Sequence, residues 1–199
     1  MPIGINGSGT ITGVSVGGLP DGIVDTDMLA AKAATAPKLG NGAIIQVAHT
    51  TKNDYFSTGS TSFTDVTGLS VTITPASSSN KIFICACVQY SSAGSGGSRV
   101  QWRILQSHAG GTAAVATGGA NGSNLEVSAG SEATGGGGNM KSATVNFLDS
   151  PARTDAVTYK IQAIAPDGAD FRLNRPVNDS TASSYHQTAS HITVMEVVA

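Results

Sequence analysis

Apolar and polar residues alternate along the chain from Ala43 to its end. A period of two is typical of β-strands that bury one face. Turn-forming strings rich in Gly, Pro, Asn and Asp separate these runs, and none of them has a helical period. The strands predicted in this way are 43–50, 62–66, 70–74, 81–90, 99–107, 124–128, 142–148, 157–164, 171–174 and 191–198. This pattern indicates an all-β fold, a β-sandwich of jelly-roll type.

Residues 1–42 have a different pattern from the rest of the chain. Short β-branched runs interrupted by glycine, such as ITGVSV, cannot build a core of their own. The string VDTDMLAAKAATA predicts a helix of about two turns, which is marginal in water by itself. We therefore divide the chain into an N-terminal attachment and bundling segment, 1–42, and a sandwich domain, 43–199. The alternative for the first segment is a flexible tail.

The predicted strand 81–90 is apolar on both faces. One face carries Ile82, Ile84, Ala86, Val88 and Tyr90, and the other carries Phe83, Cys85 and Cys87. The last strand repeats the pattern, with Met195 and Val197 opposite Ile192, Val194 and Val198. The predicted domain has no helix to cover a second apolar face, so the cover is either a long loop or a neighbouring copy of the chain. We favour a homo-oligomer, whose interface would comprise Phe83, Cys85, Cys87, Met195 and Val197.

Composition excludes several classes of function. Only 12% of the 199 residues are charged and the formal net charge is -2, so no basic surface for nucleic acid is expected. The chain has no run of about 18 apolar residues and no signal-peptide pattern at its start, so membrane insertion and secretion are not expected. Cys85 and Cys87 share one face of a strand, where they cannot readily bridge each other. They resemble small buried apolar residues more than a metal site.

Catalytic and metal-binding patterns are weak in this sequence. The histidines His49, His108, His186 and His191 have neither helical nor strand spacing for a metal. One histidine from each of three chains around a threefold axis is the alternative. No nucleophile elbow or phosphate loop is present, and most acidic residues lie in turn strings. We therefore expect no catalytic residues, no metal, no cofactor and no enzymatic activity.

Aromatic residues and glycine-rich connections are the candidates for recognition. Trp102 is predicted in the core, or alternatively on an exposed groove where its ring would stack on a sugar. Tyr55, Tyr90, Tyr159 and Tyr185 are further candidates, of which Tyr185 lies in the most polar stretch. The connections 109–124 and 129–139 are long and glycine-rich, and either bind a partner or remain disordered.

Three long strings and two short strings that precede them resemble a known family. They occur in the same order as in that family. They are GAIIQVAHTTKNDYFSTGSTSFTDVTGLSVTITPASSSNKIFICACV, VNFLDSPARTDAVTYKIQAIAPDGADFRLN and SHITVMEV, preceded by LPDGIVDTDMLA and KLG. They are similar to the C-terminal β-sandwich domain of tail-fibre-like proteins from marine and freshwater bacteriophages. The resemblance covers roughly residues 19–83 and 141–198 and carries no catalytic or binding residues. The glycine-rich region between them has no match.

The resemblance implies a virion protein, commonly trimeric, assembled in the host cytoplasm. Residues 1–42 would bind a tail, baseplate or head protein, and the sandwich would contact a glycan or protein of the host surface. Two alternatives remain open, a capsid decoration or head-fibre protein and a fibre-borne polysaccharide depolymerase. Trp102 and Tyr185 are the residues we would place at a receptor contact.

Overall fold

The computed structural model of the chain describes residues 4–5, 11–12, 38–94, 96–132, 140–177 and 186–199. The chain divides into two units, Met1–Leu39 and Gly40–Ala199. In the first, β1 (Gly4–Ile5) pairs antiparallel with β2 (Ile11–Thr12). The predicted helix at 24–36 and most of the predicted segment 1–42 lie outside the described residues.

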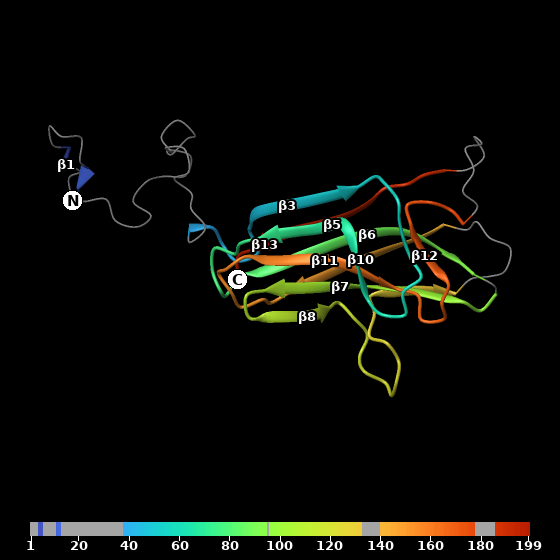
Figure 1. Cartoon of the computed structure of the whole chain (residues 1–199). Coiled ribbons are helices and arrows are strands. Elements are labelled where there is room, and N and C mark those ends of the chain that lie inside the picture. Colours follow the sequence, from blue (N-terminus) through green and yellow to red (C-terminus); the bar gives the residue numbers. More distant parts are fainter. Residues whose placement is uncertain (1–3, 6–10, 13–37, 95, 133–139, 178–185) are drawn as a thin grey trace. The chain divides into compact units, whose positions relative to one another are not determined.

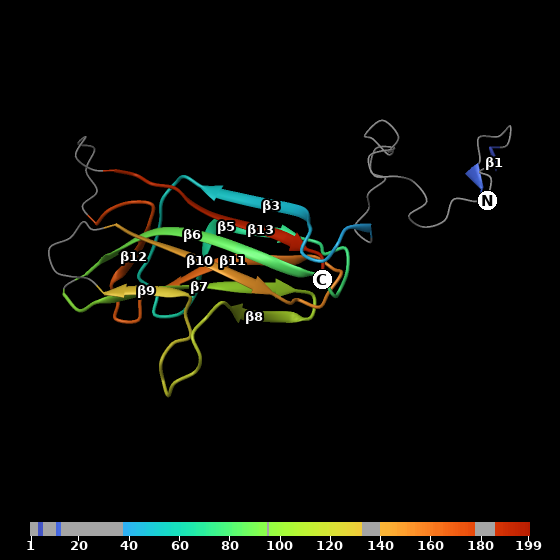
Figure 2. The ribbon, with the colours of Figure 1, turned by 180° about the vertical axis from the view of Figure 1, so that it is seen from behind.

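The second unit is built from antiparallel strands, and no α-helix occurs in its described part. Its strands are β3 (Ile44–Lys52), β4 (Phe56–Thr58), β5 (Thr64–Ile73), β6 (Lys81–Ala93), β7 (Arg99–His108), β8 (Gly111–Val115), β9 (Ala129–Glu132), β10 (Lys141–Asp149), β11 (Val157–Ile164), β12 (Asp170–Leu173) and β13 (Ser190–Val197). They form two sheets that pack face to face (Figures 1 and 2).

The strand order is that of a jelly roll. One sheet has the order β10–β6–β13–β3, and we call it the β6 sheet. The other has the order β5–β11–β7–β8, and we call it the β7 sheet. Two four-stranded sheets with these crossovers are the jelly-roll arrangement. Short strands extend both sheets: β12 and β4 continue from the far end of β6, and β9 pairs with the start of β7. The predicted fold class is confirmed.

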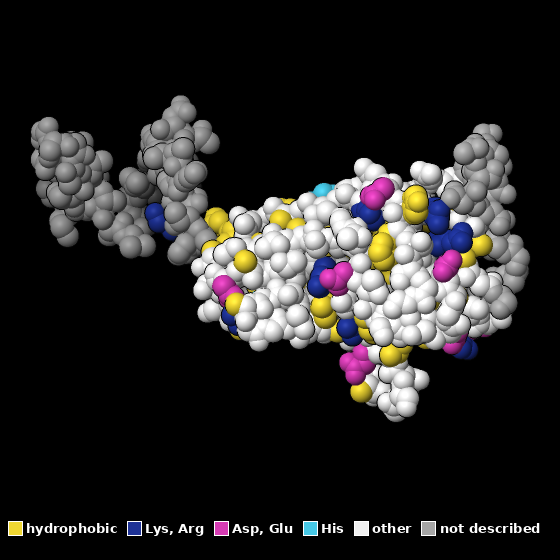
Figure 3. Space-filling model, in the orientation of Figure 1, with side chains coloured by type: hydrophobic (Ala, Val, Ile, Leu, Met, Phe, Trp, Pro, Cys, Tyr) yellow, Lys and Arg dark blue, Asp and Glu magenta, His cyan; other side chains and the backbone are white. Residues whose placement is uncertain are grey.

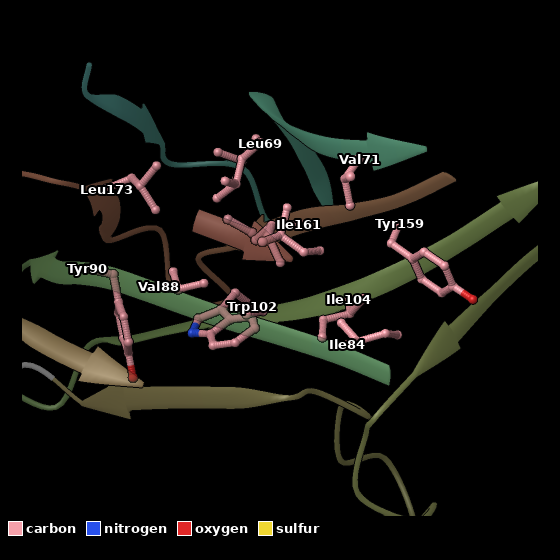
Figure 4. Packing of buried hydrophobic residues seen from close by; sticks show 14 of the residues in the cluster. Leu69, Val71, Ile84, Val88, Tyr90, Trp102, Ile104, Tyr159, Ile161 and Leu173 are labelled. Carbon is pink, nitrogen blue, oxygen red and sulfur yellow. The ribbon is translucent and has the colours of Figure 1, made fainter. Parts of the chain in front are cut away.

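The inward faces of the two sheets form one hydrophobic core (Figure 4). Every second residue of β6 is buried, from Ile82 to Tyr90, and the β7 sheet contributes the alternate residues of β7 and β11. Trp102 of β7 is fully buried and lies among Val88, Ile104 and Ile161 in Figure 4. The core is therefore complete within the described residues of a single chain.

The glycine-rich region differs from the prediction. The predicted strand 124–128 is wrong, because this segment lies in an exposed connection in which Leu125 is 42% exposed. The described parts of the adjoining glycine-rich strings instead contain β8 and β9, which both pair with β7, and residues 133–139 lie outside the described residues. Gly111 adopts φ 137°, a conformation open to glycine, at the tight turn where it pairs with His108. The predicted strands 62–66 and 70–74 join into the single strand β5.

Asn174 connects three segments at one end of the sandwich. It follows β12, is 1% exposed and adopts φ 62°, a left-handed conformation that asparagine tolerates better than most residues. Its Nδ2 donates to the carbonyl oxygens of Lys52 (2.8 Å) and Asp54 (2.9 Å). Its Oδ1 accepts a hydrogen bond from Ser190 Oγ (2.7 Å). The end of β3, the end of β12 and the start of β13 are thereby held together.

A second buried group joins the two sheets. Tyr159 of β11 donates its hydroxyl to Asp149 Oδ2 of β10 (2.6 Å), and Gln106 Nε2 of β7 donates to the same oxygen (2.7 Å). Burial raises the pKa of Tyr159 well above its ordinary value, and the hydrogen bond to Asp149 raises it further. Tyr159 therefore stays protonated across the neutral range.

Candidate self-association surface

The side chains of β6 that point away from the core lie on the outer face of the sandwich. Phe83, Cys85 and Cys87 of β6 are only half-buried, as are Met195 and Val197 of β13 beside them. The structure therefore brings the five residues predicted at an oligomer interface together on one face. We call the outward side chains of β3, β13, β6 and β10 the outer β6 face; the ribbon in Figure 2 shows these four strands.

An apolar row crosses this face. The register places Val47 beside Met195, Met195 beside Phe83 and Phe83 beside Leu148. Four strands at about 4.8 Å spacing make a row about 14 Å long. Val47 is 58% exposed and Leu148 is 52% exposed, so the ends of the row are open in the single chain. We call these four residues the apolar row.

The apolar surface continues toward the start of β3 and the end of β13. Ile44, which is 56% exposed, pairs with Val197 next to the apolar row. Gly42 N donates to Val198 O (2.8 Å), so the chain enters the domain at this same end of the sheet. The five exposed large apolar residues of the described chain are Ile44, Val47, Tyr55, Leu125 and Leu148. Three of them lie on this one face, which is a concentration rather than a random scatter.

Two polar rows lie beside the apolar row. His49, Thr193, Cys85 and Asn146 form the first, and Thr51, His191, Cys87 and Thr144 form the second. His49 Nδ1 is 2.7 Å from Thr193 Oγ1, and its Nε2 is 2.7 Å from Thr51 Oγ1. The rings of His49 and His191 have centroids 5.7 Å apart. His49 thus bonds to a threonine of each row.

The outer β6 face carries almost no charge. Among the described residues at its outward positions, Lys81 at the start of β6 is the only Lys, Arg, Asp or Glu, and its Nζ donates to Ser150 Oγ (2.8 Å). The ion pair of Asp170 and Arg172 (3.5 Å) lies beyond the face, where β12 joins the far end of β6. A surface without charge can approach another copy of itself without repulsion.

The outer face of the β7 sheet has the opposite character. Lys160 Nζ and Gln162 Nε2 both donate to Asp65, at 2.6 and 2.7 Å. Burial tends to raise the pKa of Asp65, but these two hydrogen bonds lower it overall. Arg103 stacks over the Phe63 ring at 3.7 Å from its centroid. Figure 3 shows neighbouring basic and acidic side chains on a largely uncharged polar surface, so this face neutralises its own charges.

Of the two residues predicted at a receptor contact, the structure describes one. The receptor role of Trp102 is corrected, because its ring is fully buried between the sheets and offers no area to a sugar. Tyr185 lies outside the described residues. Tyr90 and Tyr159 are also in the core. Tyr55 is 57% exposed, with the Arg175 guanidinium 4.1 Å from its ring centroid, and is the exposed aromatic residue in the described chain.

Several polar side chains of the described residues are held by hydrogen bonds within the chain. No group of three or more His, Cys, Asp or Glu residues within the described ranges could hold a metal ion. Asp155 accepts two hydrogen bonds from Arg153, and the first of these is the main reason that its pKa is lowered. Glu196 is buried and accepts bonds from Ala76 N (2.7 Å) and Asn80 Nδ2 (2.6 Å). Within the part of the chain that the structure describes, no helix is long and apolar enough to span a membrane.

Comparison with known proteins gives few matches. No family model and no curated protein matches the chain. Among solved structures, it is similar to a chain of infectious bursal disease virus, Gx strain, with 15% identity and a TM-score of 0.40 over 91% of this chain and 43% of that one. A chain of the Gt strain of the same virus gives 12% identity and a TM-score of 0.39 over 90% of this chain and 47% of that one. The present chain spans less than half the length of either.

The sequence did not predict three exposed apolar residues of this face, Ile44, Val47 and Leu148. Each lies in a predicted strand, but its partner across the sheet depends on strand order and register. Neither can be read from one sequence.

Proposed function

We propose that the chain is a bacteriophage virion structural protein of the tail-fibre type, which works as a homotrimer. The observation that carries the proposal is the outer β6 face, apolar along one row, nearly free of charge and open in the single chain. A second copy is the partner that fits it best, since an uncharged face can pack around a symmetry axis without bringing like charges together.

The role we propose is mechanical and adhesive. The resemblance to tail-fibre-like proteins supports attachment to a tail, baseplate or head component through residues 1–42 and contact with the host surface through the sandwich. A trimer presents any weak receptor contact three times, which strengthens adhesion through avidity. The acidic residues described above are held by basic or amide partners, which favours a non-enzymatic protein.

The location of the protein on the particle tests this proposal. Gold-labelled antibodies against the chain, applied to purified particles of the virus that encodes it, should mark the tail or its appendages. Labels spread over the shell would instead support a decoration protein, and unlabelled particles would refute a virion role. Incubating the purified protein with host polysaccharide should leave the polymer length unchanged, whereas shorter chains would support a depolymerase.

The oligomeric state tests the interface separately. Light scattering of the full chain should give three times the mass of one copy. The unit Gly40–Ala199 contains the complete core, so it should fold and form the same trimer. A trimer only in the full chain would place the association in residues 1–39, and a monomer in both would refute the proposed interface.

A further inference from the structure

Two histidines lie inside the surface that the proposed trimer covers. His49 of β3 and His191 of β13 are on neighbouring strands next to the apolar row, with ring centroids 5.7 Å apart. Both nitrogens of His49 are 2.7 Å from a threonine hydroxyl. The His49 ring cannot turn away from the face without losing both contacts.

The protonation of His49 and His191 depends on whether a neighbouring copy covers them. Imidazole is the side chain that gains its charge just below neutral pH. A threonine hydroxyl can donate or accept, so His49 keeps both contacts in either protonation state. In the free chain, water stabilises the imidazolium ions. Beneath a neighbouring copy that water is removed, and two cations would lie close together in a poorly solvated contact.

No carboxylate of the described residues faces the pair. The other titratable groups on the outer β6 face are the thiols of Cys85 and Cys87 on β6 and the ammonium of Lys81, about 13 Å or more along that strand. The described outward positions of β10 are Ser142, Thr144, Asn146 and Leu148, none of which titrates.

Carboxylates and cations on the surrounding elements already have partners or lie away from the pair. Lys52 of β3 is buried and pairs with Asp54 (2.7 Å). Glu196 of β13 is buried and bonded to Ala76 and Asn80. His186 is exposed in the segment that leads into β13. A positive charge on either histidine would therefore have no neighbouring carboxylate among the described residues to balance it.

We propose that His49 and His191 make the assembly open in mild acid, an inference that rests on the proposed homotrimer. Protons bind the separated chains better than the assembled ones, so lowering the pH favours separation. For each proton that must be released on assembly, lowering the pH raises the dissociation constant by up to about tenfold per pH unit.

Sedimentation of the full chain across a concentration series, at pH 7.5 and pH 5.5, tests the inference. The concentration at half-dissociation should be at least tenfold higher at pH 5.5 for the wild type. The double variant His49→Gln/His191→Gln, which keeps hydrogen-bonding side chains, should change less than threefold. The control His108→Gln/His186→Gln, with both substitutions outside this face, should respond to pH like the wild type.

The outcomes separate this inference from the function on which it rests. A wild-type monomer at pH 7.5 would refute the proposed interface itself. A trimer equally stable at both pH values would refute the histidine switch alone, as would acid dissociation that persists in the double variant. Dissociation by EDTA at pH 7.5 would also overturn it, since the histidines would then bind a metal between copies. Far-ultraviolet circular dichroism should show the same strand content at both pH values, and loss of that signal at pH 5.5 would overturn the inference.

Discussion

Replacing Leu148 with aspartate should dissociate the proposed trimer without unfolding the chain. Leu148 lies at the open end of the apolar row and is 52% exposed, so the folded monomer loses little apolar burial. Covering the exposed half of a leucine contributes about 0.8 to 1.5 kcal/mol, half the value for a full side chain. An aspartate there would place an unpaired carboxylate in the contact, at a cost of about 3 kcal/mol or more. The two terms together are about 4 kcal/mol, or about a thousandfold in the dissociation constant.

Leu125 supplies the matched control for this experiment. It is another exposed leucine, at 42%, but it lies in the connection between β8 and β9, away from the outer β6 face. Light scattering at a series of concentrations should give a monomer for Leu148→Asp and a trimer for Leu125→Asp. Leu148→Thr, which retains good β propensity and adds no charge, should weaken the trimer about tenfold. Equal masses for the two aspartate variants would refute the placement of the interface on this face.

Three further predictions concern the same surface and the groups that position it. Cys85 and Cys87 should react with a maleimide at least tenfold more slowly in the wild-type trimer than in a dissociated variant, and equal rates by mass spectrometry would contradict coverage of the face. Asn174→Ala should lower the free energy of urea unfolding by about 3 kcal/mol, since three hydrogen bonds are lost and alanine is strained at φ 62°. Asn174→Gly should recover about 1 kcal/mol of this loss, because glycine adopts a positive φ without strain. Stability should fall as the pH rises above about 10, because the unfolded chain releases the Tyr159 proton there and the folded chain retains it; the alkaline loss of stability should be smaller in Tyr159→Phe by up to about 1.4 kcal/mol per pH unit.

The jelly roll could be predicted because its signals are local. Alternation at 81–90 and 157–164 identifies strands with one buried face, and the strings between them contain turn formers. The strands β8 and β9 were not predicted because their residues are small. The strings GTAAV and AGSE have little apolar contrast between the two faces of a strand. Both strands owe their place to pairing with β7, which is a tertiary effect that a local pattern does not contain.

The candidate surface could be predicted only in its centre. Phe83, Cys85 and Cys87 are conspicuous because they make a strand apolar on both sides, which is a local contradiction that one sequence can display. Val47 and Leu148 join the row only because β3 and β10 lie on either side of β13 and β6. Trp102 lies in the core, as its alternating strand predicts, so its alternative role at a receptor contact is the one that is wrong.

The contrast between the two outer faces is the strongest argument for a second copy. Both sheets belong to one sandwich and share one core, so their outward side chains are free of packing constraints within the described chain. On the β7 sheet these positions hold Asp65, Lys160 and Arg103, as expected of a surface in contact with water. The β6 sheet instead holds an apolar row beside the His49 imidazole, which bonds the hydroxyls of Thr51 and Thr193. Charged side chains are expected on a face in contact with water, and the described outward positions of these four strands hold one, Lys81, which favours a face that is covered in the assembled protein.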